Sequence, residues 1–318
     1  NTISPADILN GNKANQIPQL GIDGLRLWVA QSDYSSDISV GPTVLKHVGD
    51  NLKKLRFTFR FLLGNLHETE AQIQYKKLGG LDQYILSKLA TLEADCKVGF
   101  QTYNFAKVIK SVNHFINVTL SSIYFDVRKD CLYTDSIDSP KRQATLTVFK
   151  EILKTLTSIM GPILPIMTQE VWNNSPKYIS KDMESNFQAG WYTSVGGYNE
   201  KVEDEFTELL KFRDQIKCTM DKAVRNDKNV KNSLETGITL VSKKHSLISK
   251  LLVKHQNDIA DLLVVSDFDV VSNPESLLVG VKYKYEIELD ENNSVILRPA
   301  KGEKCPRCWK FTKEPELE

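Results

Sequence analysis

Apolar residues recur every three to four positions along the middle of the chain, which is the period of an amphipathic α-helix. Four stripes of this kind follow one another, beginning near Gly49, Leu81, Phe105 and Pro140. The first stripe carries Leu52, Leu55, Phe59, Leu62 and Leu66. Ser139 before Pro140 is typical of a helix start, with an N-cap followed by proline at the first helical position. The pattern predicts an antiparallel helical bundle, which we place at residues 49–215.

Beyond residue 215 the period shortens to about two, which indicates β-strands. Tyr283, Tyr285, Ile287 and Leu289 alternate with charged residues, as on a strand with one solvated face. The runs "GITLV" and "SVILRPA" are apolar and end near Gly, Asn or Pro. These features predict a small α+β domain at residues 216–300. The turn-rich stretch at about residues 175–200 is predicted to be loosely ordered.

Composition is ordinary for a soluble globular protein: 318 residues, 41% hydrophobic and 25% charged. The net charge of +1 gives no global basic signature, so any role in nucleic-acid binding must rest on local patches. No apolar run approaches the length of a membrane span, and we expect no membrane contact. The five cysteines do not follow the spacing of a disulfide framework, which favours a reducing compartment.

Motifs for catalysis are missing from the sequence. It contains no P-loop, no G-x-G-x-x-G, no G-x-S-x-G elbow and no H-E-x-x-H. The five histidines follow no recognisable spacing. We therefore expect no active site within this chain.

The first helical stripe has a basic face beside it. Lys53, Arg56 and Arg60 stand at i, i+3 and i+7, Lys54 flanks them, and no acidic residue occurs between Lys53 and Leu66. Like charges at this spacing cost a few tenths of a kcal/mol each, which a phosphodiester backbone would relieve. The alternative is that this face is simply solvated or pairs with carboxylates on a neighbouring helix. From charge alone, this alternative is more common than nucleic-acid binding.

The tail carries a second basic row and two cysteines. Lys301, Lys304, Arg307, Lys310 and Lys313 recur every three residues around Trp309 and Phe311, with only Glu303 opposing them within the segment. Cations interleaved with aromatic rings suit single-stranded nucleic acid. Cys305 and Cys308 have the spacing at which two thiolates chelate one zinc ion, although a closed zinc site needs four ligands. A redox pair is the alternative, but no thioredoxin-like context surrounds it.

Several segments, in this order, resemble the C-terminal part of bacterial-type isoleucyl-tRNA synthetases, which are class I enzymes. They are "NTISPADIL", "GIDGLRLWVAQSDYSSDISV", "RFTFRFLLGNL", "LDQYILSKL", "DVRKDCLYTDS", "RQATLTVFKEILKTLTSIMGPILPIMTQEVW", "KNSLETGITL" and "GEKCPRCWKF". The resemblance covers almost the whole chain. Valyl and leucyl enzymes share the architecture, but "LRLWVA", "RFLLGNL" and the terminal C-x-x-C-W favour the isoleucyl family.

The resemblance implies a mainly α fold: the helical anticodon-binding bundle of class I synthetases, the α+β domain and a truncated zinc knuckle at residues 301–318. Residues 1–48 would be the segment that follows the family's K-M-S-K-S-type loop. The parent enzyme would attach isoleucine to tRNA using ATP and magnesium in a catalytic domain absent here, so the chain alone should be inactive. Three features depart from the family: Phe57 where it commonly has Asn, Cys131 where it has Arg, and a missing second cysteine pair. Either this sequence stops inside the zinc knuckle or the parent protein has lost the second pair.

By this resemblance the partner is isoleucine tRNA, and the protein is expected to be a monomer. We assign tRNA contacts to Lys53, Lys54, Arg56, Arg60, Arg307 and Trp309, and zinc ligation to Cys305 and Cys308. Arg26 is expected to hold the connecting segment to the bundle, with a contact to the tRNA stem as the less favoured alternative. Insertions rich in Asn and Lys resemble those of fungal organellar enzymes, which favours the mitochondrial matrix over a bacterial cytoplasm. A non-enzymatic, protein-binding helical scaffold is the competing hypothesis; it predicts no affinity for tRNA.

Overall fold

The computed structural model describes residues 3–38, 40–66, 70–225, 230–242, 246–273, 280–306 and 308–312. The chain forms two compact units. The first comprises Asn1–Leu78, Ile85–Tyr124 and Ile137–Asn199, and the second Gly79–Tyr84, Phe125–Ser136 and Glu200–Glu318. Among the described residues, no helix combines the length and the apolar composition that crossing a membrane requires.

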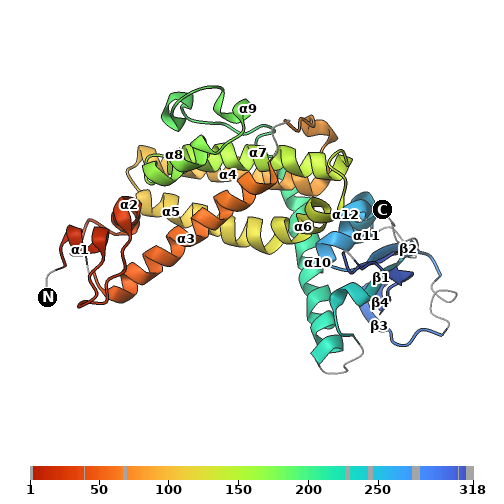
Figure 1. The fold of residues 1–318 in the computed structure, drawn as a ribbon. Coiled ribbons are helices and arrows are strands. Elements are labelled where there is room, and N and C mark those ends of the chain that lie inside the picture. The colour runs from red at the N-terminus through yellow and green to blue at the C-terminus, as the bar shows by residue number, and fades with distance from the viewer. Residues whose placement is uncertain are drawn as a thin grey trace. The chain divides into compact units, whose positions relative to one another are not determined.

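Helices make up the first unit (Figure 1). They are α1 (Pro5–Asn10), α2 (Gly21–Gln31), α3 (Pro42–Asn65), most of α4 (Gly80–Gln101), α5 (Phe105–His114), the π-helix η2 (Phe115–Tyr124), α7 (Pro140–Met160), α8 (Pro165–Asn173) and α9 (Lys177–Ser180), with 3-10 turns η1 (Tyr75–Lys77) and η3 (Asn186–Ala189). The predicted apolar stripes form the core: Leu55, Phe59 and Leu62 of α3 are buried. The mainly helical prediction is confirmed.

Two boundaries differ from the prediction. The first long helix begins at Pro42 rather than near Gly49, because Gly41 and Pro42 supply the helix start. Gly49 lies inside this helix, where Leu20 packs close to its Cα. The third stripe is continuous in sequence, but its hydrogen bonding changes from α to π at Phe115; an apolar period does not distinguish the two.

The stretch at about residues 175–200 is not loosely ordered, and that prediction was wrong. Two buried carboxylates fix it to the helices. Glu93 of α4 accepts hydrogen bonds from Trp191 Nε1 (3.0 Å) and Thr193 Oγ1 (2.8 Å). Glu151 of α7 accepts from Tyr192 Oη (2.7 Å) and the Val195 backbone N–H (3.1 Å).

The second unit is α+β. Its helices are α6 (Phe125–Thr134), α10 (Glu200–Arg225), α11 (Leu247–Lys254) and α12 (Gln256–Leu263), with the 3-10 turn η4 (Ser233–Glu235). A four-stranded sheet has the order β2-β1-β4-β3, formed by β1 (Thr236–Ser242), β2 (Asp267–Val271), β3 (Tyr285–Asp290) and β4 (Asn293–Pro299). β1 pairs parallel with β2 and antiparallel with β4. Side chains of β3 alternate between half-buried and exposed, as the sequence pattern predicted.

Two buried arginines form ion pairs in this unit, one between its helices and one within its sheet. Arg128 of α6 is 1% exposed and bonds Asp82 (3.0 Å) and Asp258 (3.1 Å). Arg298 of β4 donates to Thr239 Oγ1 at 2.8 Å and to the carboxylates of Asp267 and Asp269 on β2. A separate two-stranded hairpin, β5 (Glu303–Lys304) and β6 (Phe311–Thr312), contains the two C-terminal cysteines.

Candidate nucleic-acid interface

The basic face predicted on the first helical stripe lies on the solvent side of α3. Lys53, Lys54, Arg56 and Arg60 are all exposed, whereas Leu55 and Phe59 between them are buried. Lys53 extends into solvent, with 73% of its side chain exposed and its nearest carboxylate oxygen, on Asp50, 3.9 Å away. The helix therefore presents its cations outward in the predicted arrangement.

Among the described residues, one of these cations, Arg56, has a carboxylate partner within 3 Å. Arg56 Nη1 donates to Glu170 Oε1 of α8 at 2.9 Å, which is the neighbouring-helix pairing that the sequence left open. The bond to Glu170 raises the pKa of Arg56. Both side chains are about half exposed, so the pair contributes little and a phosphate can replace the carboxylate at small cost. Within the described part of the chain, neither Lys54 nor Arg60 has a side-chain hydrogen bond or ion pair.

A groove of about 480 Å³ runs beside these cations between α3 and α8. Its lining residues include Arg56, Phe57, Arg60, Met167 and Asn174. Phe57 is 65% exposed, which is unusual for a large aromatic side chain. An exposed ring between two guanidinium groups can stack on an unpaired base while the cations contact phosphates.

Two residues of α2 fix the start of α8, which carries Glu170. Asp23 is 7% exposed, and its carboxylate accepts from the N–H groups of Met167 (2.7 Å) and Ile166 (3.3 Å). It thus caps a helix whose own N-cap, Leu164, has no side-chain acceptor. Arg26 donates to the carbonyls of Pro162 (2.7 Å) and Ile163 (3.0 Å), so the expected structural role of Arg26 is confirmed. Asp23 was missed, because nothing local in the sequence marks it as a cap.

The C-terminal hairpin brings Cys305 and Cys308 together. The Cys305 N–H donates to the Lys310 carbonyl at 2.8 Å, and the Trp309 N–H donates to the Cys305 carbonyl at 2.9 Å. Burial raises the pKa of the Cys308 thiol, and the nearby Cys305 thiol adds to that rise. The paired thiols fit two positions of a tetrahedral zinc site. Among the described residues, no group of three or more His, Cys, Asp or Glu side chains could hold a metal ion.

Trp309 stands out from this hairpin. It is 57% exposed, its φ of 65° is in the left-handed region, and Lys304 Nζ lies 5.3 Å from its ring centroid. A cleft of about 440 Å³ adjoins it, lined in part by Lys129, Asn232 and Ser233. Arg307, predicted to act beside Trp309, lies outside the described residues.

The row of basic residues in the tail is partly neutralised, which the sequence did not reveal. Lys310 lies between Asp261 (2.6 Å) and Asp130 (3.1 Å), and Lys301 is 2.5 Å from Asp269. These carboxylates come from α12, α6 and β2 and not from the tail. Lys310 therefore attaches the hairpin to helices of the second unit, and Lys301, just before the hairpin, is held to β2.

The comparison with known families identifies the central part of the chain. Residues 82–241, half of the chain, match the family described as the anticodon-binding domain of tRNA ligase. The chain belongs to this family. In this anticodon-binding chain the matched range extends from α4 to β1. The basic helix α3 precedes that range, and the cysteine hairpin follows it.

Curated relatives extend the match to nearly the whole chain. The mitochondrial isoleucine–tRNA ligase of Schizosaccharomyces pombe is 33% identical over 326 residues, covering 98% of this chain. The isoleucine–tRNA ligase of Geobacillus kaustophilus and the mitochondrial one of Saccharomyces cerevisiae are each 34% identical and cover 99%. The chain spans about a third of the length of these relatives.

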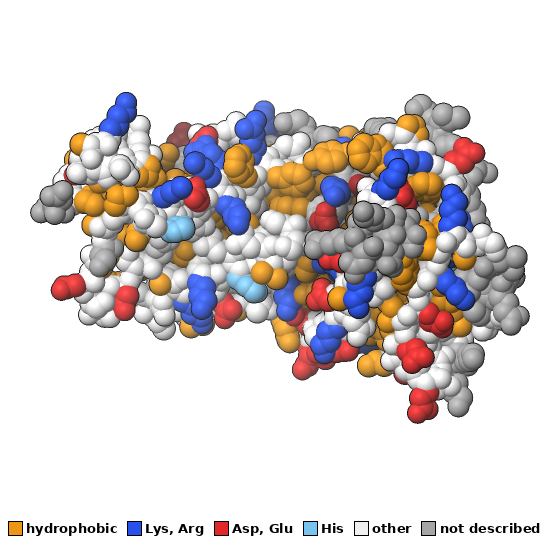
Figure 2. Space-filling model, turned by 90° about the horizontal axis from the view of Figure 1, so that it is seen from below, with side chains coloured by type: hydrophobic (Ala, Val, Ile, Leu, Met, Phe, Trp, Pro, Cys, Tyr) orange, Lys and Arg blue, Asp and Glu red, His pale blue; other side chains and the backbone are white. Residues whose placement is uncertain are grey.

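Two positions noted as departures now have a structural setting in this anticodon-binding chain. Phe57 is exposed and lines the α3–α8 groove. Cys131 is buried in α6, and its thiol donates to the Arg128 carbonyl at 3.1 Å. On the face drawn in Figure 2, lysine and arginine side chains are dispersed among acidic and uncharged ones.

Proposed function

We propose that this chain is the tRNA-binding part of an isoleucine–tRNA ligase and that it binds the anticodon stem and loop of isoleucine tRNA. The observation that carries the proposal is the exposed face of α3 in a chain of the anticodon-binding family. Lys54 and Arg60 have no partner among the described residues, and the Arg56–Glu170 pair is weak enough to exchange for a phosphate.

The exposed face of α3 and the C-terminal hairpin both carry side chains that suit an anticodon loop. Its bases are unstacked and single-stranded, so side chains can reach their edges and faces. On α3, Lys53, Lys54, Arg56 and Arg60 contact phosphates and base edges while Phe57 stacks. On the hairpin, Trp309 stacks on a second base, with Lys304 Nζ 5.3 Å from the centre of its ring. Arg307 also contacts the RNA in this proposal. Stacking on an aromatic side chain is worth about 1–3 kcal/mol per base.

The activity of the whole protein is part of the same proposal. It attaches isoleucine to tRNA, with ATP and magnesium acting in a catalytic domain outside this chain. Cys305 and Cys308 supply two zinc ligands, and a further pair of ligands in the parent protein completes the site. Zinc binding then stabilises the folded knuckle. The three relatives described above are all isoleucine–tRNA ligases, which supports isoleucyl over valyl or leucyl specificity.

The setting and the assembly state complete the proposal. Relatives include mitochondrial and bacterial enzymes. We place the parent protein in the mitochondrial matrix, with a bacterial cytoplasm as the alternative, and we expect a monomer.

Single substitutions on α3 test the proposal. Arg60→Ala should cost about 1–3 kcal/mol of tRNA binding if Arg60 contacts a base. If Arg60 contacts only phosphate, the loss should be similar for all tRNAs and the salt slope should fall by about one. Lys97→Ala, which removes an exposed lysine of α4, is the matched control. Wild-type affinity in both Arg60→Ala and Lys54→Ala would refute the assignment of this face.

A further inference from the structure

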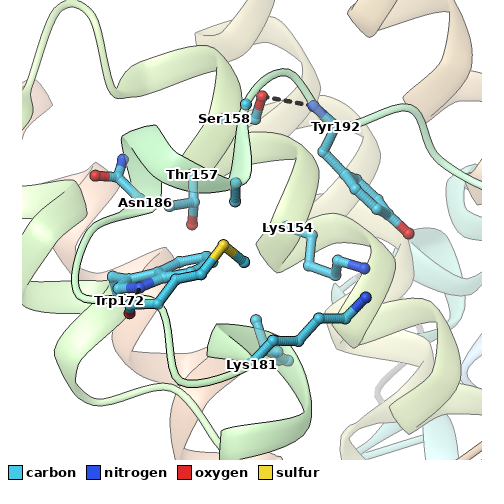
Figure 3. Close-up of a pocket in the computed structure, with 11 residues that line it drawn as sticks. Lys154, Thr157, Ser158, Trp172, Lys181, Asn186 and Tyr192 are labelled. Carbon is cyan, nitrogen blue, oxygen red and sulfur yellow. Dashed lines mark hydrogen bonds between the residues drawn. The ribbon is translucent and has the colours of Figure 1, made fainter.

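A second, smaller cavity opens in the first unit, among residues that the proposed tRNA contacts do not use. It has a volume of about 140 Å³ and lies between α7, α8 and the segment from Ile179 to Tyr192 (Figure 3). Its lining residues are Lys154, Thr157, Ser158, Trp172, Ile179, Lys181, Met183, Asn186, Ala189, Gly190 and Tyr192.

One end of the cavity is apolar and rigid. Trp172 is 7% exposed, and its indole Nε1 donates to the Met183 carbonyl at 2.8 Å, which fixes the ring. Ile179 and Met183 complete the apolar lining. An apolar protein cavity of about 150 Å³ holds one benzene ring, so this space suits a single six-membered ring better than a fused pair. The cavity is open to solvent, so the ribose and phosphate of a nucleotide would extend from the ring to its mouth.

The other end is cationic. Lys154 Nζ lies 3.8 Å from the centre of the Tyr192 ring, and in Figure 3 Lys154 and Lys181 extend their ammonium groups toward the same side, away from Trp172. Burial lowers the pKa of Lys154, and Lys181 contributes to the decrease. Neither lysine has a carboxylate partner within hydrogen-bond distance in the described part of the chain. Lys154 is half-buried and Lys181 is exposed. A nearby anion favours the charged form of both ammonium groups.

The polar groups around Lys154 already have hydrogen-bond partners. Tyr192 donates its hydroxyl to Glu151, and its backbone N–H donates to Ser158 Oγ at 2.9 Å. Glu151 also accepts from the Val195 N–H and lies 4.0 Å from Lys150. Its carboxylate is therefore engaged by these donors; its charge raises the pKa of Lys154, but burial outweighs that effect.

The cavity also has an unsatisfied polar group. Asn186 is 7% exposed, and its amide oxygen is buried without a hydrogen-bond partner in the described structure. Leaving such a group unpaired costs about 1–3 kcal/mol. Asn186 lines the cavity and in Figure 3 lies at the same end as Trp172, so its amide would reach the edge of a ring beside Trp172 once it turns toward the cavity.

We propose that this cavity binds a pyrimidine nucleotide, with the base against Trp172 and within reach of Asn186, and the phosphate between the ammonium groups of Lys154 and Lys181. The site goes beyond the proposed anticodon contacts, because none of its residues belongs to α3 or to the C-terminal hairpin. The nucleotide is either a free pyrimidine monophosphate or one unstacked residue of an RNA.

Calorimetric titration of the chain with uridine monophosphate tests the proposal. We expect binding that is stronger than that of uridine, inorganic phosphate, phenyl phosphate or adenosine monophosphate. Lys181→Asn should weaken it about tenfold, because one charged contact to phosphate is lost. Asparagine tolerates the left-handed backbone at position 181, where φ is 49°. The control Lys177→Asn removes an equally charged, exposed lysine from α9 that does not line the cavity.

Lys154→Met, which keeps the apolar stem over Tyr192, should weaken uridine monophosphate binding to a similar extent. An unchanged thermal unfolding midpoint would show that this variant folds.

Parallel titrations with tRNA identify the source of the nucleotide. Weaker tRNA binding by Lys181→Asn indicates an RNA residue, and unchanged tRNA binding indicates the free nucleotide. No saturable binding of uridine monophosphate, equal binding of phenyl phosphate, or an equal loss in Lys177→Asn would overturn the proposal. None of these results would alter the expected effect of Arg60→Ala on tRNA binding, so the two proposals fail separately.

Discussion

Replacing Asp23 by alanine removes the carboxylate of α2 that caps α8. The N–H of Met167 is buried, and losing its only acceptor costs about 1–3 kcal/mol. The carboxylate also lies beside the positive end of the helix dipole, which adds about 0.3–1 kcal/mol. The Ile166 N–H is partly exposed, so water replaces that bond at little cost. We therefore expect a loss of about 1.5–4 kcal/mol in the local stability of α8.

Hydrogen–deuterium exchange of peptides from residues 165–173 measures this loss, because it reports local opening in a chain whose two units need not unfold together. Exchange in Asp23→Ala should be at least about tenfold faster than in the wild type. Asp23→Asn keeps an acceptor and loses the charge, so its effect should be smaller. Asp37→Ala makes the same charge change at an exposed site and serves as control. Wild-type protection of α8 in Asp23→Ala would refute the reasoning.

Two further predictions concern the two units separately. Gly196 has a φ of +91°, and a Cβ there would lie 2.3 Å from the Tyr75 ring. Gly196→Ala should therefore cost about 2–4 kcal/mol in urea unfolding. Gly197→Ala, at a φ of +64° with open space around it, should cost only about 1–2 kcal/mol, and equal losses would contradict this account. Burial of Asp269 opposes ionisation, but Lys301 and Arg298 outweigh it and lower its pKa below 3.8. This stabilisation is complete above the unfolded pKa and is lost as the pH falls through the lower folded pKa, so acid titration of Asp269→Asn should show a shallower loss of stability below about pH 4. A wild-type acid profile in that variant would contradict the assignment.

The sequence revealed features that depend on local order. The apolar stripe of α3 and the outward direction of Arg60 follow from the helical period alone, because every turn repeats the same geometry. The alternation in β3 is likewise a local property of a strand. The family resemblance added the anticodon-binding assignment, which the comparisons confirmed.

Features that depend on distant pairing were not predictable. Asp23 caps a helix 143 to 144 positions away, and Glu170 meets Arg56 across 114 positions. The two buried glutamates of α4 and α7 interrupt apolar patterns in the way a surface residue would, so nothing marked them as anchors of residues 191–195. Lys310 was interpreted as a free cation, because the carboxylates that pair with it belong to other elements.

The central claim is that the chain recognises isoleucine tRNA through its anticodon stem and loop. Competition binding with three RNAs tests it most directly: isoleucine tRNA, valine tRNA, and valine tRNA carrying the isoleucine anticodon stem and loop. The account predicts that the chimera competes as well as isoleucine tRNA and that valine tRNA is at least about tenfold weaker, with all affinities falling steeply as salt rises. Equal competition by all three RNAs, or no salt-dependent binding of any of them, would contradict it.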